Sequence, residues 1–189
     1  MVSIVVICGP SNSGKTTVGR AVAKALRYSH WEMSDYATTK KRTFEEASEP
    51  ISTLDFVEHV LWPEQGPDAV ADPLLEFISE ASLSPTNTGV VVTGPRRFEE
   101  IEQIRSLNQP DLFFYLVVPF ATRLDRARRR TPVTELNFDV DFAHRTQLEA
   151  SWGLLGEPVD SLFHLIPNTG PIGDAAHAIE TLVRNQLPM

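Results

Sequence analysis

The sequence predicts a three-layer α/β fold with a largely parallel, five-stranded sheet and helices on both faces. Short runs of β-branched and aromatic residues alternate along the chain with segments of helical periodicity. The first run leads directly into the glycine-rich segment Gly9–Thr16 and then into a helical segment. Because crossovers between parallel strands are right-handed, the loops that follow the strands are expected on one edge of the sheet.

Five runs are expected to form the strands. Ser3–Cys8 (SIVVIC) is too short for a helix and ends at Gly9-Pro10, which is typical of a strand buried on both faces. Gly89–Thr93 (GVVVT) is the second clear run. The other strands are expected at Tyr28–Ser34, Asp111–Val118 and Leu162–Ile166.

Apolar residues recur at helical spacing between these runs. Helices are expected over Lys15–Leu26, Asp68–Ser82, Phe98–Leu107, Thr122–Arg130, Asp139–Trp152 and Asp174–Leu187. Residues 39–67 are polar and contain three prolines, so short helices and loops are expected there. We interpret residues 39–67 as a substrate-binding cap and residues 121–147 as a small helical lid, both within one domain that spans residues 1–189.

The composition narrows the classes of function. A net charge of −8 argues against a nucleic-acid partner, because such affinity comes mostly from Lys and Arg. Cys8 is the only cysteine, which excludes an internal disulfide or a cysteine-rich metal site. No basic region precedes the first apolar run, and no stretch reaches the roughly 18 apolar residues of a membrane span, so we expect a cytoplasmic protein without a membrane partner. The sequence leaves a homodimer open.

Gly9–Thr16 (GPSNSGKT) fits the phosphate-binding P-loop pattern. Its glycines allow a tight turn whose N–H groups point at a phosphate, and the helix that starts there adds its positive dipole end. We expect Lys15 to reach the β- and γ-phosphates of ATP and the Thr16 hydroxyl to bind Mg²⁺. The residues expected to bind ATP are Gly9, Ser11, Asn12, Ser13, Gly14, Lys15, Thr16 and Thr17.

Phosphoryl transfer requires cations in fixed positions, because negative charge spreads over the phosphate oxygens. Arg96 and Arg97 follow a strand, and a bidentate guanidinium there suits a substrate phosphate. A second cluster consists of Arg123, Arg126, Arg128, Arg129 and Arg130. The alternative interpretation of this cluster is a solvated helix face that pairs with acids such as Asp125.

Asp35 follows a strand beside the P-loop, so we expect it to orient or deprotonate the acceptor; the alternative is a helix N-cap or turn aspartate. The histidines show no spacing typical of metal ligands and receive no role. The catalytic candidates are therefore Lys15, Asp35, Arg126 and Arg130.

Taken in order, these motifs resemble those of P-loop kinases of the nucleoside monophosphate kinase superfamily, in particular phage-type deoxynucleoside monophosphate kinases and dephospho-CoA kinase-like proteins. The segments that carry the resemblance are Gly9–Thr16, Glu64–Ile78, Val90–Arg105, Arg123–Arg130 with Arg145 downstream, and Leu162–Gly170. The resemblance implies ATP and Mg²⁺ on the P-loop with Asn168 beside the adenine, a substrate phosphate near Arg96, and a lid whose arginines close over the reacting phosphates. The residues expected to bind the substrate are Asp35, Arg96, Arg97 and Arg145. The family usually has an aspartate at the end of the third strand, where this chain has Thr93.

Three functions stay open on this basis. The leading one is transfer of the ATP γ-phosphoryl group to a nucleoside or deoxynucleoside monophosphate. The second is transfer to a hydroxyl group, as in dephospho-CoA kinases or kinases of modified bases in DNA. The third is a nucleotide-binding regulator with little transfer, which the missing aspartate favours slightly.

Overall fold

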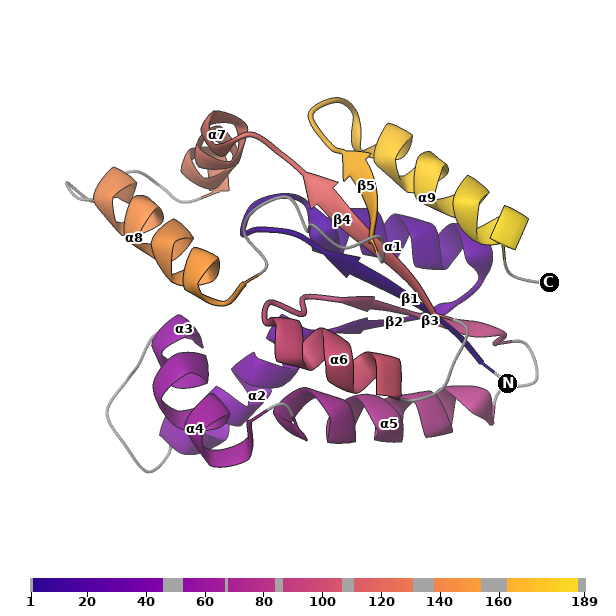
Figure 1. The fold of residues 1–189 in the computed structure, drawn as a ribbon, viewed down its shortest axis with the longest axis horizontal. Helices are drawn as coiled ribbons and strands as arrows, with labels where there is room; N and C mark the ends of the chain where they lie inside the picture. The colour runs from indigo at the N-terminus through magenta and orange to yellow at the C-terminus, as the bar shows by residue number, and fades with distance from the viewer. Residues whose placement is uncertain are drawn as a thin grey trace.

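The computed structural model describes residues 2–45, 53–66, 68–83, 87–106, 111–130, 138–153 and 163–186, and over these residues five parallel strands form one sheet (Figure 1). The strands are β1 (Ser3–Cys8), β2 (Ser29–Glu32), β3 (Gly89–Thr93), β4 (Asp111–Val117) and β5 (Phe163–Pro167). Their order, β2-β3-β1-β4-β5, puts the strand that precedes the P-loop at the centre of the sheet. The predicted fold class is confirmed.

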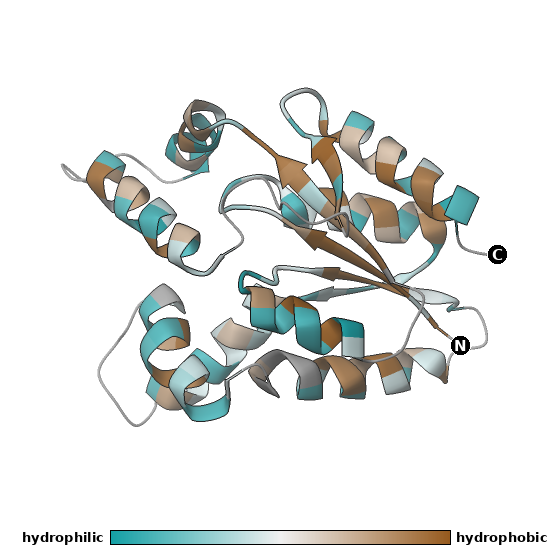
Figure 2. Ribbon diagram, viewed as in Figure 1, coloured by the Kyte–Doolittle hydropathy of each residue, from teal (hydrophilic) through white to brown (hydrophobic). Residues whose placement is uncertain are grey.

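Helices cover both faces of the sheet. On one face lie α1 (Lys15–Leu26) and α9 (Ile172–Gln186), and on the other lie α5 (Asp68–Ser82) and α6 (Phe98–Ser106) (Figure 1). Alternate residues of β1 face opposite layers: Ile4 and Val6 pack with α5 and α6, whereas Val5 and Ile7 pack with α1 and α9. The central strand β1 and its neighbours β3 and β4 are accordingly mainly apolar (Figure 2), as expected for a parallel sheet between two helical layers, whereas the edge strand β2 (SHWE) is largely polar.

The remaining helices lie beyond the carboxyl ends of the strands (Figure 1). They are α2 (Met33–Glu45), α3 (Thr53–Phe56), the π-helix η1 (Val57–Leu61), α4 (Trp62–Gln65), α7 (Phe120–Arg130) and α8 (Phe138–Ser151). The described part of the predicted cap is helical, and a small apolar cluster that includes Phe56 and Leu61 holds its helices together.

One predicted boundary was wrong in a way that matters for the site. Strand β2 ends at Glu32 rather than at Ser34, because α2 begins at Met33. Glu32 is therefore the carboxylate at the end of the strand, whereas Asp35 lies in the first turn of α2 with an exposed side chain. A sequence pattern of alternating residues does not reveal that a helix starts without an intervening loop.

Helix α1 lies close against the sheet at Gly19. A Cβ atom there would lie 2.3 Å from Cγ2 of Thr93 and 3.1 Å from Nε2 of His30. We expect Gly19→Ala to lower the free energy of unfolding by about 1–3 kcal/mol, the usual cost of overpacking, although alanine is the better helix former. Urea denaturation followed by circular dichroism measures this. Gly173→Ala is the matched control, since its added methyl group meets nothing within 4 Å; equal stability of the two variants would contradict the prediction.

Candidate active site

The P-loop joins β1 to α1 through a tight turn. Gly9 and Gly14 have φ angles of 140° and 94°, which glycine adopts without strain. Asn12 also has a positive φ, of 61°, a region that asparagine tolerates better than most residues. Glycine is required at position 14 for a second reason, because a Cβ atom would lie 2.8 Å from Nδ2 of Asn168.

Lys15 is buried inside this turn. Its Nζ donates hydrogen bonds to the carbonyl oxygens of Gly9 (2.6 Å) and Pro10 (2.9 Å). Burial lowers the pKa of Lys15 to about 8, and the nearby charge of Arg96 acts in the same direction. The ammonium group is thus tied to the backbone at the start of the loop, and it loses its proton more readily than an ordinary lysine does.

Helix α7 presents three arginines to the P-loop at helical spacing. Arg123 donates to the carbonyl oxygen of Ser11 (3.4 Å), and Arg126 donates to that of Ser13 (3.1 Å). Arg130 donates to Oδ1 of Asn12 (3.5 Å). The predicted candidates Arg126 and Arg130 therefore lie at the loop. Sequence reasoning gave Arg123 no individual role, although its side chain is buried.

Other members of the cluster have different surroundings. The exposed side chain of Arg128 forms ion pairs with Asp139 and Asp125, so the alternative interpretation, a solvated face that pairs with acids, holds for this residue. Asn168, at the end of β5, is buried and donates from Nδ2 to the carbonyl oxygen of Ser13 (2.7 Å). Arg126 also donates to the Asn168 carbonyl oxygen (2.7 Å), which ties α7, β5 and the P-loop together.

A carboxylate stands next to the position of the missing third-strand aspartate. Glu32 and Thr93 are paired neighbours on β2 and β3, and the Thr93 hydroxyl donates to Oε2 of Glu32 (2.7 Å). His30 Nε2 lies 2.8 Å from the same hydroxyl. The hydroxyl has one proton and donates it to Glu32, so His30 is the donor in the hydrogen bond between His30 and Thr93. The result is a chain from His30 through Thr93 to a buried carboxylate.

Glu149, on α8, is a second buried carboxylate that sequence reasoning missed. Both of its carboxylate oxygens accept from the backbone N–H of Ser11 (3.1 and 3.0 Å), and the Ser11 hydroxyl donates to Oε1. Oε1 also lies 3.6 Å from Nη1 of Arg96. The Glu149 carboxylate thus accepts from a P-loop N–H group and lies beside the Arg96 guanidinium. Both of these groups could also bind a phosphate. No local pattern could have indicated this contact, since 138 positions separate the two residues.

Glu100 fixes the turn between β3 and α6. Its buried carboxylate accepts from the backbone N–H groups of Arg96 (2.7 Å) and Arg97 (3.1 Å). Burial raises the pKa of Glu100 to about 7, and the two N–H donors work against that rise. This turn sends the two arginines in different directions: Arg96 faces Glu149, whereas Arg97 pairs with Glu58 and stacks on Trp62 and Trp152.

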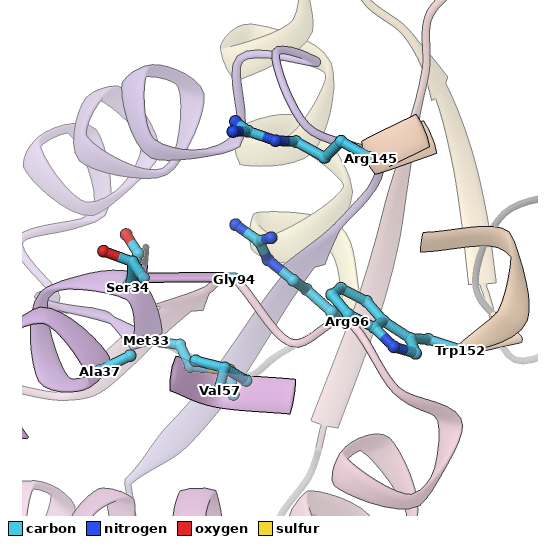
Figure 3. A pocket seen from close by; sticks show the side chains of 9 residues that line it. Met33, Ser34, Ala37, Val57, Gly94, Arg96, Arg145 and Trp152 are labelled. Atoms are coloured by element: carbon cyan, nitrogen blue, oxygen red, sulfur yellow. The ribbon is translucent and has the colours of Figure 1, made fainter. Parts of the chain in front are cut away.

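Three cavities surround these groups. The P-loop cavity, of about 370 Å³, is lined by Ser11, Asn12, Gly14, Lys15, Thr16, Thr17, Glu32, Ser34, Gly94, Arg96, Arg130 and Arg145. The cap cavity, of about 250 Å³ (Figure 3), is lined by Met33, Ser34, Ala37, Thr53, Val57, Gly94, Arg96, Arg145 and Trp152. The lid cavity, of about 500 Å³, is lined by Gly14, Thr17, Thr122, Asp125, Arg126, Arg129, Arg130, Asn168, Thr169, Gly170, Pro171 and Ile172.

The P-loop and cap cavities share four lining residues, Ser34, Gly94, Arg96 and Arg145. In Figure 3 the guanidinium groups of Arg96 and Arg145 point into the same space, with Met33, Ala37 and Val57 below them. Most of the predicted site residues are thereby brought together, including Lys15, Thr16 and the two shared arginines. Asp35 and Arg97 are not among the described residues that line these cavities, and their predicted roles stay predictions.

This architecture defines a P-loop protein with a kinase-like fold. The chain belongs to the AAA domain family, whose model matches residues 5–139. Comparison with curated proteins returned no match.

The solved structures that are similar to the chain include three kinases. A gluconokinase from Sinorhizobium meliloti 1021 has a TM-score of 0.58 at 22% identity, with 97% of this chain and 94% of that chain covered. A sugar kinase from Janibacter sp. HTCC2649 has a TM-score of 0.63 at 18% identity (100% and 96% covered). A shikimate kinase from Bacteroides thetaiotaomicron has a TM-score of 0.51 at 15% identity (96% and 98% covered). At these identities the likeness establishes a shared fold.

Two further observations apply to the described residues. No helix among them combines the length and the apolar character that crossing a membrane requires. No three of their His, Cys, Asp or Glu side chains gather so as to hold a metal ion.

The pKa of Lys15 makes phosphate binding depend on pH. Because the free protein loses the Lys15 proton near pH 8, ATP binding above that pH must restore it, and the affinity should fall as the pH rises from about 7 to about 9. Isothermal titration in two buffers of different ionisation enthalpy should show proton uptake on binding. Lys15→Ala should bind weakly and lack this uptake; proton release in the wild-type protein would contradict the prediction.

The position of Glu149 makes it a competitor of bound phosphate. We expect Glu149→Gln to bind ATP about threefold more tightly or better, because it removes one negative charge beside Ser11 and Arg96. Isothermal titration measures the dissociation constant. Glu102→Gln, on the exposed face of α6, makes the same charge change away from the loop and should leave the affinity unchanged. Weaker binding by Glu149→Gln would mean that Glu149 assists the nucleotide.

Proposed function

We infer that the protein is an ATP-dependent phosphotransferase that transfers the γ-phosphoryl group to the phosphate of a nucleoside or deoxynucleoside monophosphate. The observation that carries this proposal is the junction of the P-loop and cap cavities at Arg96 and Arg145. A donor phosphate on the P-loop and an acceptor in the cap cavity would meet between two guanidinium groups. Positioning and charge stabilisation of this kind supply most of the catalysis of phosphoryl transfer.

The P-loop side of the junction fits the polyphosphate of ATP. Lys15 and Arg130 line the P-loop cavity, and Arg126 and Arg130 continue into the lid cavity. The lid cavity, with Asn168 and the turn after it, is the place for the nucleoside of ATP. Oδ1 of Asn168, a buried polar atom without a partner among the described residues, supports a polar ligand here.

The P-loop cavity also suits Mg²⁺. Oxygen ligands are what this ion prefers, and it commonly shares its coordination with substrate phosphates. The Thr16 hydroxyl and the Glu32 carboxylate both line the P-loop cavity and would hold it. When bound, Mg²⁺ supplies neutralisation of the phosphate charge. Thr93 and Ser34, which donate to Glu32, would fix the direction of that carboxylate.

The cap cavity supports a nucleoside monophosphate as the acceptor. Its lining combines apolar side chains (Met33, Ala37, Val57) and the indole of Trp152 with two guanidinium groups at the junction. A flat, weakly polar ring fits the apolar part, and a dianionic phosphate fits the arginines. Arg145 is the better placed of the two, since Arg96 also faces Glu149.

A second candidate is transfer to a hydroxyl group of a small carboxylate or sugar. The similar solved structures are named for gluconate, sugar and shikimate. A carboxylate would be held by Arg145 much as a phosphate would. Against this candidate, the apolar residues of the cap cavity offer a polyhydroxylated molecule few partners, Ser34 and Thr53 being the described hydroxyls that line it.

An acceptor panel decides between these functions. We expect ADP formation from ATP and Mg²⁺ to rise with at least one nucleoside monophosphate, and Lys15→Ala to reduce the rate about 100-fold or more, because a charged donor at the reacting phosphates is lost. A coupled ADP assay gives the rate, and ³¹P NMR identifies the product. Stimulation only by gluconate, shikimate or dephospho-CoA would establish the hydroxyl-directed function instead. Tight ATP binding with no turnover on any acceptor would favour a nucleotide-binding regulator.

A further inference from the structure

Four side chains behind the cap cavity form one connected cluster. The guanidinium of Arg97 pairs with the carboxylate of Glu58 and lies over the rings of Trp62, at 4.1 Å, and Trp152, at 5.1 Å. The indole N–H of Trp152 donates to the same Glu58 oxygen (2.9 Å). We call these four residues, Glu58, Trp62, Arg97 and Trp152, the clasp.

The clasp joins segments that are distant in sequence. Glu58 lies on η1, Trp62 begins α4, Arg97 follows β3, and Trp152 follows α8. An isolated antiparallel bridge between Arg97 and Gly153 connects the last two segments through their backbones. The cap and the end of α8 are thereby attached to the sheet at one point.

Three of the four segments that enter the clasp also line the cap cavity, the exception being α4 with Trp62. Val57 lines the cavity and Glu58 belongs to the clasp; Arg96 lines the cavity and Arg97 belongs to the clasp. Trp152, a residue that is only 5% exposed, belongs to both. The position of three lining residues therefore depends on contacts made behind the cavity.

We propose that the clasp sets the width of the acceptor site and holds Trp152 as the wall that selects acceptors with a flat aromatic ring. This inference rests on the proposed function of the same cavity and deepens it. With its N–H bonded to Glu58 and Arg97 against its ring, the indole has one fixed orientation, which lets it stack with a ring at little entropic cost. Arg97 is then a positioning residue that acts through Trp152 and Val57.

Probes with and without an aromatic base test this selection. Adenosine, guanosine, cytidine, uridine and thymidine monophosphates carry an aromatic base, and ribose 5-phosphate lacks one. We expect Trp152→Ala to weaken the best ring-bearing probe about tenfold or more, the scale of one lost base-stacking contact, and to leave ribose 5-phosphate and ATP unchanged. Isothermal titration gives all three dissociation constants.

Variants that retain the Trp152 side chain test the clasp itself. Arg97→Gln should weaken the ring-bearing probe about threefold or more, in line with the loss of a cation–π contact, and Arg97→Lys should restore part of the affinity. Glu58→Gln should act in the same direction. Arg105→Gln, which breaks an exposed ion pair on α6, is the matched control and should change nothing. These partly exposed residues can be changed without opening the core.

The outcomes separate the clasp from the proposed function. Ring-bearing probes that bind in a Trp152-dependent way but are not phosphorylated would overturn the function and leave the clasp standing. Phosphorylation of monophosphates with unchanged binding in Trp152→Ala and Arg97→Gln would overturn the clasp alone. A wild-type protein that binds no ring-bearing monophosphate would overturn both.

Discussion

The whole site depends on how the carbonyl groups of the P-loop are satisfied. A loop that turns its N–H groups toward a ligand leaves carbonyl groups directed at the protein, and buried carbonyls need donors. Here the Ser13 carbonyl oxygen accepts hydrogen bonds from Arg126 and Asn168. The Ser11 carbonyl oxygen accepts one from Arg123, and Lys15 donates to the carbonyl oxygens at the start of the loop. These bonds fix α7 and the end of β5 against the loop. The arginines of α7 are therefore positioned by the backbone of the loop as well as by their own helix.

Such a concentration of cations needs nearby anions, even in a chain with a net charge of −8. The buried carboxylate of Glu149 provides one, against Ser11 and Arg96, and the buried side chain of Glu100, whose pKa is raised to about 7, lies under the turn that carries Arg96 and Arg97. The two have different consequences. Glu100 bonds the backbone N–H groups of Arg96 and Arg97 and so holds the turn itself. Glu149 bonds groups that a phosphate also suits, so a bound ligand has to share them or move the helix that carries it.

The sequence predicts well what depends on local pattern. The glycine spacing of the P-loop and the apolar runs of β1 and β3 each specify their own structure, and those strands have the predicted bounds. The different directions of the Arg96 and Arg97 side chains do not follow from such a pattern of apolar residues and glycines. The signal that could have indicated them is Glu100 near the start of α6, where a glutamate commonly accepts from the backbone N–H before the helix. Contacts such as that between Arg97 and Trp152 require the fold itself, because nothing near either residue specifies the other.

Glu32 shows how the fold changes the meaning of a missing residue. In the sequence alone, Thr93 stands at the end of the third strand where the resembled family usually has an aspartate. In the sheet, Thr93 is paired with Glu32, and adjacent strands are only about 4.8 Å apart. A glutamate side chain spans that distance, and the threonine hydroxyl donates to it (2.7 Å), so the acid has moved by one strand and the threonine now orients it. The P-loop cavity consequently keeps a carboxylate beside Lys15 and Thr16, and the absence of the third-strand aspartate is no evidence against phosphoryl transfer.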